Sequence, residues 1–333
     1  MFLKKSLKAF IAAAAISTAV IASAMIYFRM NRHTVYEDTF FSMDTVVSVR
    51  SDIDVCKDTR DIFKSLEAVY DCRSENGEAA RLNESGSLEN CSNELIRGLN
   101  NILALNKKYG SSVDITAGSL TLLWNIDSEN PSVPSEKDID AARETVGTGN
   151  IKVNGNSVAL QNGAKLDFGA VAKGIALDRV KAFLKDIDDS SDTIVSTGSS
   201  VLLYGEGENG YFNVDIKEPE SGGVLGRVKT EPCFLSTSGG YERYFEKGGK
   251  KYCHIMDTET GYPSESDITT VTVFAESGLL SDFISTQIFI EGTKGIENHL
   301  ASQNYKIIAA DKNKKLYVSP GLEFLKKDLS YEE

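Results

Sequence analysis

An uncharged apolar run near the amino terminus sets the first limit on how this chain can fold. Residues 9–28 carry no charged side chain, and a basic head stands in front of them, formed by Lys4, Lys5 and Lys8. As a helix that rises about 1.5 Å per residue, this run of 20 residues is long enough to cross a hydrocarbon core of roughly 30 Å. The globular fold is therefore to be sought in the residues after the run.

The apolar run divides the chain into two parts. We predict that residues 1–33 form a membrane anchor or signal segment and that residues 34–333 form one folded domain. Basic residues favour the cytoplasmic side, so the basic head predicts an extracytoplasmic domain. The apolar run is longer than that of a typical signal peptide, which favours a retained anchor in the cell membrane. Ala22-Ser23-Ala24 is similar to a signal-peptidase site, so a cleaved signal peptide remains the alternative.

The composition is that of a globular protein and excludes some partners. Hydrophobic residues make up 41% of the 333 residues and charged residues 25%. The net charge of −12 argues against nucleic acid as a partner of the domain. The five cysteines show no metal-ligand spacing, so we expect neither a zinc site nor a disulfide framework.

Hydrophobic periodicity predicts an α+β fold. Helical spacing marks residues 59–70, 93–109 and 279–290, whereas residues 40–49 alternate as one strand and residues 73–87 read as a loop. Several short strands follow one another between residues 193 and 256, with connections of hairpin length. Strands that cluster between helices favour mixed or antiparallel sheets with flanking helices over a doubly wound parallel sheet.

Residues 166–178 suggest a place where a ligand can approach the backbone. They read as the end of a strand, a turn at Gly169 and the first turns of a helix. A helix start suits a phosphate, Lys173 would add a full charge, and Asp167 could accept a hydrogen bond from a ligand. The spacing of a P-loop and the dinucleotide fingerprint are both absent. Glycine-plus-lysine turns are common, so this stretch taken alone favours an ordinary strand-to-helix connection.

Two further runs contain residues that can carry chemistry. Asp282 and Thr286 share one face at the start of a predicted helix, with Ser285 beside them, and such hard oxygen atoms suit Mg²⁺. His254 stands at the end of a predicted strand, before a turn rich in Asp, Thr and Gly. Each run alone also fits a purely structural role. A serine hydrolase is disfavoured because the chain has no Gly-x-Ser-x-Gly elbow.

The order of these and other short motifs resembles the ApbE-type FAD:protein FMN transferases. The motifs that carry the resemblance are Met43-x-Thr45, Arg81-Leu82-Asn83, Asp114-Ile115-Thr116-x-Gly118, Leu166-Asp167-x-Gly169-Ala170-x-Ala172-Lys173-Gly174, Ser236-Thr237-Ser238-Gly239, His254-Ile255-x-Asp257-x-x-Thr260-Gly261-x-Pro263 and Asp282-x-x-Ser285-Thr286. Each motif is weak by itself, whereas seven in one order are specific.

The resemblance implies a Mg²⁺-dependent flavin transferase. Such an enzyme splits FAD, passes the FMN half to a Thr or Ser hydroxyl of an acceptor protein through a phosphoester and releases AMP. It also implies a single two-lobed α+β domain with the flavin site between the lobes. The implied partners are acceptor proteins of membrane or extracellular redox systems. A FAD pyrophosphatase that yields FMN and AMP, or a non-catalytic flavin-binding protein, remains the alternative.

The resemblance also implies roles for individual residues. Metal ligands are implied for the carbonyl of Ala170 and for Asp282 and Thr286, with Ser285 adjacent. His254 matches the histidine proposed to assist catalysis. The positions implied to line the FAD site are Met43, Asp114, Asp167, Lys173 and Met256.

The chain departs from the family pattern at three places. Asp44 stands where the family usually has Gly, which would place a charge near the adenine pocket. The chain has Thr197-Gly198-Ser199-Ser200 where a Gly-Gly pair is usual, which would narrow the approach of the pyrophosphate. Cys72 and Arg73 occupy a region where the family often has an aromatic residue.

Overall fold

The computed structural model describes residues 34–74, 77–110, 112–187, 191–219, 222–327 and 330–331. The predicted anchor or signal segment, residues 1–33, lies outside these ranges. Within the described ranges, no helix is both long and apolar enough to span a membrane.

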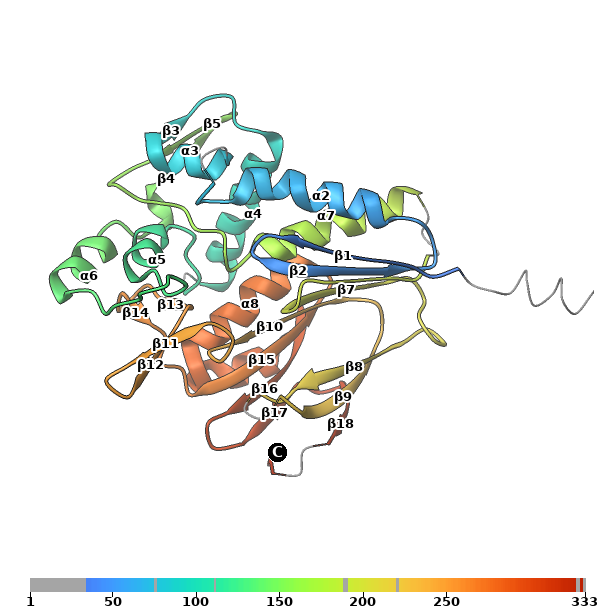
Figure 1. The fold of residues 1–333 in the computed structure, drawn as a ribbon. Helices are drawn as coiled ribbons and strands as arrows, with labels where there is room; N and C mark the ends of the chain where they lie inside the picture. Colours follow the sequence, from blue (N-terminus) through green and yellow to red (C-terminus); the bar gives the residue numbers. More distant parts are fainter. Residues whose placement is uncertain are drawn as a thin grey trace, which may run out of the picture.

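An eight-stranded antiparallel sheet forms the centre of the fold (Figure 1). Its strands, in spatial order, are β1 (Tyr36–Ser42), β2 (Thr45–Ser51), β6 (Thr193–Ser196), β7 (Ser200–Tyr204), β10 (Phe234–Gly239), β15 (Ile268–Ala275), β16 (Tyr305–Asp311) and β17 (Leu316–Val318). Every ladder between these strands is antiparallel, which confirms the predicted α+β class with antiparallel sheets.

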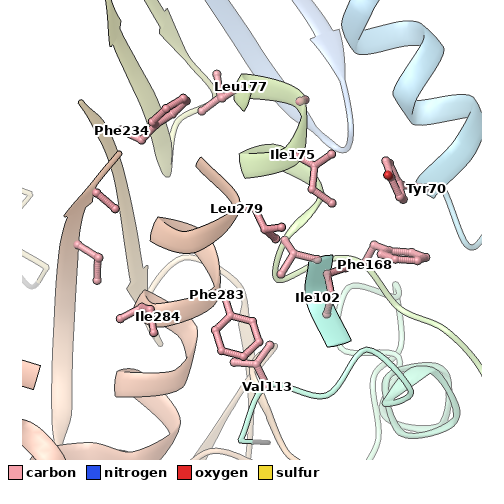
Figure 2. Packing of buried hydrophobic residues seen from close by; sticks show 14 of the residues in the cluster. Tyr70, Ile102, Val113, Phe168, Ile175, Leu177, Phe234, Leu279, Phe283 and Ile284 are labelled. Carbon is pink, nitrogen blue, oxygen red and sulfur yellow. The ribbon is translucent and has the colours of Figure 1, made fainter. Parts of the chain in front are cut away.

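Helices cover one face of this sheet and form the main core with it. They include α2 (Cys56–Tyr70), α4 (Asn93–Tyr109), α7 (Ala172–Ile187) and α8 (Gly278–Glu291). Helix α8 is apolar around most of its circumference, and ten of its 14 residues are buried, as expected for a helix enclosed between a sheet and other helices. Figure 2 shows part of this core, where side chains of α4, α7 and α8 gather.

A second core lies on the opposite face of the sheet. Alternate side chains of a strand point to opposite faces, so Phe234 of β10 belongs to the main core and Leu235 to the second. A small sheet covers this second face, made of β8 (Phe212–Lys217), β9 (Val224–Thr230) and β18 (Glu323–Lys326). Among the described residues, this second core includes none from β1 or β2, so the outer face of that hairpin remains uncovered by the small sheet.

Shorter elements complete the fold at the ends of the sheet. The remaining helices are α3 (Glu78–Ser85), α5 (Gly118–Trp124), α6 (Glu136–Arg143) and α9 (Ile296–Leu300), with 3₁₀ turns η1 (Thr148–Asn150) and η2 (Gly292–Gly295). The remaining strands are β3 (Ser87–Leu88), β4 (Ile151–Asn154), β5 (Ser157–Leu160), β11 (Tyr244–Lys247), β12 (Lys250–Cys253), β13 (Met256–Asp257) and β14 (Tyr262–Pro263). Trp124 packs with Tyr252 and Tyr262 in a third, smaller core.

Two sequence predictions of local structure are wrong. The strand predicted at residues 40–49 is a hairpin of β1 and β2, whose turn residues Met43 and Asp44 have φ angles of 53° and 55°. Such turns are usually marked by Asn-Gly or Asp-Gly, and neither pair is present here. The predicted loop at residues 73–87 contains helix α3, which forms because Ala79 and Leu82 are fully buried.

The starts of α7 and α8 meet without any side chain between their backbones. A Cβ atom added to Gly174 of α7 would lie 2.2 Å from the carbonyl oxygen of Gly278 of α8. A Cβ atom on Gly278 would in turn lie 2.4 Å from the carbonyl oxygen of Gly174. Both residues must therefore be glycine for the two helices to approach this closely.

We expect Gly174→Ala to destabilise the protein by about 1–3 kcal/mol, because overpacking forces the two backbones apart. Alanine favours a helix by about 1 kcal/mol over glycine, so a loss of stability would report the clash and not helix propensity. Chemical denaturation measures the difference. Gly149→Ala is the matched control, since nothing lies within 4 Å of a Cβ atom at that position. Equal stabilities of the two variants would contradict the prediction.

Candidate functional site

A cavity of about 530 Å³ lies where the loops before α5 and α7 meet the start of α8 and the tip of the β1–β2 hairpin. This volume is within the range of small-molecule sites, roughly 300–1,000 Å³. All ten residues predicted from the sequence line it, namely Met43, Asp114, Asp167, Ala170, Lys173, His254, Met256, Asp282, Ser285 and Thr286. The structure thus brings these residues together, while their individual roles remain predictions.

The carboxylate of Asp282 is buried and held by hydrogen bonds on both of its oxygens. Its side chain comes from α8, and the residue is only 5% exposed. One oxygen, Oδ2, accepts a hydrogen bond of 2.6 Å from the N–H of Gly174, in the first turn of α7. The other, Oδ1, accepts one of 2.6 Å from the hydroxyl of Ser200. Both oxygens therefore have fixed directions, and each keeps a lone pair for a further partner.

Hydroxyl groups continue the polar lining from Asp282 along α8. The Ser285 hydroxyl donates to the carbonyl of Asp282 at 3.0 Å and accepts from Ser238 at 3.0 Å. The Thr286 hydroxyl has a longer contact of 3.4 Å with Ser238. Thr286 is thus better placed than Ser285 to offer its oxygen to a ligand.

The cavity is lined by oxygen donors of the kind that suits a small, hard cation. The candidate donors are one carboxylate, the Thr286 hydroxyl and the carbonyl of Ala170, which all line the same cavity. No group of three or more His, Cys, Asp or Glu side chains suited to a metal occurs in the described ranges. A set with a single carboxylate suits Mg²⁺, which completes its shell with water and phosphate oxygens.

Two other carboxylates at the cavity hold loops in place. Asp167 accepts from the N–H of Gly169 at 2.7 Å and from the Thr121 hydroxyl at 2.7 Å. Asp114 accepts from the N–H and the hydroxyl of Thr116 and from the N–H of Thr148. Each carboxylate therefore organises the backbone that lines the site, and this role does not depend on a ligand.

The hairpin tip is attached to the cavity wall by a residue that the sequence analysis missed. The carboxylate of Glu67, on α2, accepts from the N–H of Met43 at 2.7 Å and from the hydroxyl of Ser42 at 3.0 Å. On the other side, the Thr45 hydroxyl donates to the carbonyl of Thr197 at 2.9 Å. No local pattern marks Glu67, because its partners lie on a different element.

The structure gives a physical account of the departures from the family pattern. Asp44 has a left-handed backbone conformation, which glycine adopts freely and which aspartate tolerates better than most residues. Its charge is exposed at the tip of the hairpin. Ser199 lines the cavity, whereas Ser200 is buried and donates to Asp282. The second serine is thus part of the site, although the sequence analysis gave it no role.

Cys72 and Arg73 both line the cavity, in the region where the family often has an aromatic residue. Burial raises the pKa of the Cys72 thiol, and the nearby carboxylate of Asp167 acts in the same direction. The thiol is therefore protonated at neutral pH and is a poor nucleophile.

His254 is neutral at physiological pH. Burial lowers the pKa of its imidazole from 6.5 to about 4, and the positive charges of Arg243 and Lys173 act in the same direction. Its Nδ1 lies 3.2 Å from the carbonyl oxygen of Arg243. A carbonyl oxygen can only accept, so in the neutral ring Nδ1 carries the proton and Nε2 keeps its lone pair. Nε2 is thus able to accept a proton.

Comparison with known proteins gives this geometry a context. The ApbE family model matches residues 43–309. The FAD:protein FMN transferase of Klebsiella pneumoniae is 29% identical over 215 residues, which are 63% of this chain and 66% of that protein. The FAD:protein FMN transferase of Escherichia coli K12 is 32% identical over 200 residues, which are 57% of each chain. These matches span less than two thirds of the length of each relative.

Solved structures agree with the sequence matches. The crystal structure of the ApbE protein of Thermotoga maritima superposes with a TM-score of 0.81 at 25% identity and covers 86% of this chain and 97% of that one. The flavin transferase ApbE of Vibrio cholerae has the same fold, with a TM-score of 0.76 at 21% identity over 86% of this chain and 97% of that one. The family model alone accounts for most of the described domain, so this chain belongs to the ApbE family.

Proposed function

We propose that this protein is a Mg²⁺-dependent FAD:protein FMN transferase. A Thr or Ser hydroxyl of an acceptor protein attacks the phosphorus of the FMN half of FAD, and the pyrophosphate bond to the adenylate breaks. A phosphoester joins FMN to the acceptor, AMP leaves, and the proton of the hydroxyl passes to a base. The observation that carries this proposal is the fixed carboxylate of Asp282 in a cavity that also contains Lys173 and a neutral His254.

Asp282, Thr286 and the carbonyl of Ala170 would hold the Mg²⁺, with Ser285 beside them. When bound there, the ion would neutralise charge on the pyrophosphate. Lys173, in the first turn of α7, brings a second positive charge to the same cavity. The hydrogen bonds from Gly174 and Ser200 orient the carboxylate before any cation binds.

Nε2 of His254 would take the proton of the attacking hydroxyl. A threonine hydroxyl is a poor nucleophile at neutral pH, so a nearby base that is free of its proton accelerates the attack. The carbonyl of Arg243 supports this role because it keeps the other ring nitrogen protonated. The same groups would also activate a water molecule, in which case FAD would be hydrolysed to FMN and AMP.

The predicted anchor at residues 1–33 belongs to the same proposal. With this segment in the cell membrane, the domain would act outside the cytoplasm on acceptors of membrane or extracellular redox systems.

The direct test is AMP release from FAD by the full chain in detergent, with and without Mg²⁺ and a recombinant acceptor domain of a membrane redox complex. We expect Mg²⁺-dependent AMP and a flavin attached to the acceptor. Asp282→Asn should lower the rate by more than about 100-fold, since loss of an outer partner of a metal ligand already costs 10- to 100-fold. Asp215→Asn, at an exposed carboxylate that pairs with Arg227, is the control.

Three results would change the assignment. AMP with free FMN in the presence of the acceptor would indicate a pyrophosphatase. Binding of FAD without AMP release would indicate a flavin-binding protein. An Asp282→Asn variant with full activity would remove that residue from the mechanism.

Ser200→Ala should weaken the binding of a divalent cation. The substitution leaves Oδ1 of Asp282 without its donor, and loss of such a partner typically costs 10- to 100-fold in affinity. Titration with Mn²⁺, followed by electron paramagnetic resonance, measures the dissociation constant without any turnover. Ser236→Ala is a matched control, because that buried hydroxyl pairs with Ser281 and not with Asp282. The same constant in both variants would show that Ser200 does not orient the ligand.

The imidazole of His254 should titrate near pH 4 and not near 6.5. The unfolded chain then binds a proton that the folded protein does not, so stability falls as the pH drops from about 6.5 to about 4 and is unaffected above that window. Proton NMR of the ring gives the midpoint. Arg243→Gln should raise it, because a positive charge is removed, whereas Arg227→Gln, on β9, should not. A wild-type midpoint near 6.5 would contradict the prediction.

A further inference from the structure

We propose that the acceptor protein docks on the tip of the β1–β2 hairpin, on an apolar pair formed by Phe41 and Val46. This inference rests on the proposed function, because it concerns the macromolecule that receives the FMN group. We call the two side chains the tip pair.

The tip pair is an apolar surface exposed to solvent. Phe41 and Val46 are directly opposite each other in the antiparallel register, and they are 68% and 57% exposed. The side chains at the next outward positions, Thr39 opposite Ser48, are polar. Beyond them, Glu37 and Arg50 form an ion pair of 3.5 Å. Within β1 and β2, apolar character on this face is therefore confined to the tip.

The tip pair is close in the chain to residues that line the cavity. The turn between the two strands, Met43 and Asp44, lines it together with Thr45. Hydrogen bonds from Ser42 and Met43 to Glu67, and from Thr45 to Thr197, hold the turn on both sides. The tip pair is thus presented on a fixed support, and a partner that binds it pays little for ordering this surface.

The reaction requires a protein to lie at this rim. The hydroxyl of the acceptor must reach a phosphorus inside the cavity, so the residues around that hydroxyl must contact the surface beside the opening. Aromatic side chains are enriched at such interfaces and contribute much of their binding energy. An acceptor segment with an apolar residue close to its modified Thr or Ser fits the tip pair.

The free edge of β1 offers the same segment a backbone partner. In the part of the chain that the structure describes, β1 is an edge strand and pairs only with β2. In a hairpin with a two-residue turn, the two residues that flank the turn, here Ser42 and Thr45, form a hydrogen-bonded pair. The next pair, Phe41 and Val46, is then not hydrogen-bonded, so the N–H and C=O groups of Phe41 face away from β2. Further along β1, the N–H of Thr39 already donates to the Asp38 carboxylate at 2.9 Å. An extended segment of the acceptor could therefore pair with the edge of β1 mainly at the tip, next to the cavity.

The position of the tip favours an acceptor over a lipid surface. The predicted anchor precedes residue 34, at the Tyr36 end of β1, whereas the tip lies at the other end of the strand, roughly 20 Å away. The tip also lies beside the cavity in which the transferred group would be held. This position beside the cavity therefore favours the acceptor over a membrane or a second copy of the chain.

The test uses the full chain with both residues of the tip pair changed, Phe41→Ser and Val46→Ser, and a recombinant acceptor domain that the unchanged protein flavinylates. We expect KM for the acceptor to rise at least about tenfold, because a few buried aromatic contacts carry most of the binding energy of an interface. The affinity for FAD, measured by quenching of flavin fluorescence, should stay the same. Leu325→Ser on β18 is the matched control, since Leu325 is 66% exposed and lies on the small sheet.

The outcomes separate this inference from the proposed function. An unchanged KM in the double variant would overturn the docking surface and leave the transferase assignment intact. Absence of flavin transfer by the unchanged chain would overturn both. Sedimentation velocity and vesicle binding complete the test. Loss of a dimer, or loss of binding to phosphatidylcholine and phosphatidylglycerol vesicles, with transfer to the acceptor unchanged would assign the tip pair to another occupant.

Discussion

The site depends on a reciprocal contact between the N-terminal ends of α7 and α8. The carboxylate of Asp282, on α8, accepts from the N–H of Gly174 on α7. The carboxylate of Asp178, on α7, accepts from the N–H groups of Gly278 and Leu279 at the start of α8, at 2.8 and 3.0 Å. Burial raises the pKa of Asp178, and these hydrogen bonds oppose the shift. Each helix thus places a carboxylate at the positive end of the other, and the glycines let the two ends come close enough.

This contact also determines where the polar groups of α8 lie. A row of hydroxyl groups on the adjacent strands matches the polar positions of the helix, with Ser200 bonded to Asp282, Ser236 to Ser281 and Ser238 to Ser285. Small side chains let a buried helix pack closely on the sheet while each of these hydroxyls finds a partner. The mostly buried α8 can therefore place the carboxylate of Asp282 at the cavity wall.

Sequence patterns predicted those features of the structure that depend on residues close together in the chain. The helix at residues 279–290 was predicted almost to its ends, because its apolar positions and the shared face of Asp282 and Thr286 depend on neighbours in sequence. Ser200 and Glu67 were missed as site residues, because their partners are 82 and 24 residues away and no periodicity marks such pairs. The turn at residues 43–44 was missed because an aspartate takes the place of the glycine that normally signals it.

In the proposed reaction, the charges around the cavity would link ligand binding to proton transfer. Lys173 and Arg243 are the cations that lower the pKa of His254, and both line the cavity where an anionic pyrophosphate would lie. Before a ligand arrives, burial and these two charges together keep Nε2 free of a proton. An anion bound beside them would offset their positive charge, so the pKa of His254 would rise towards its ordinary value when the ligand is bound. A base that is unprotonated in the empty site would then become more basic at the moment when a proton has to be accepted.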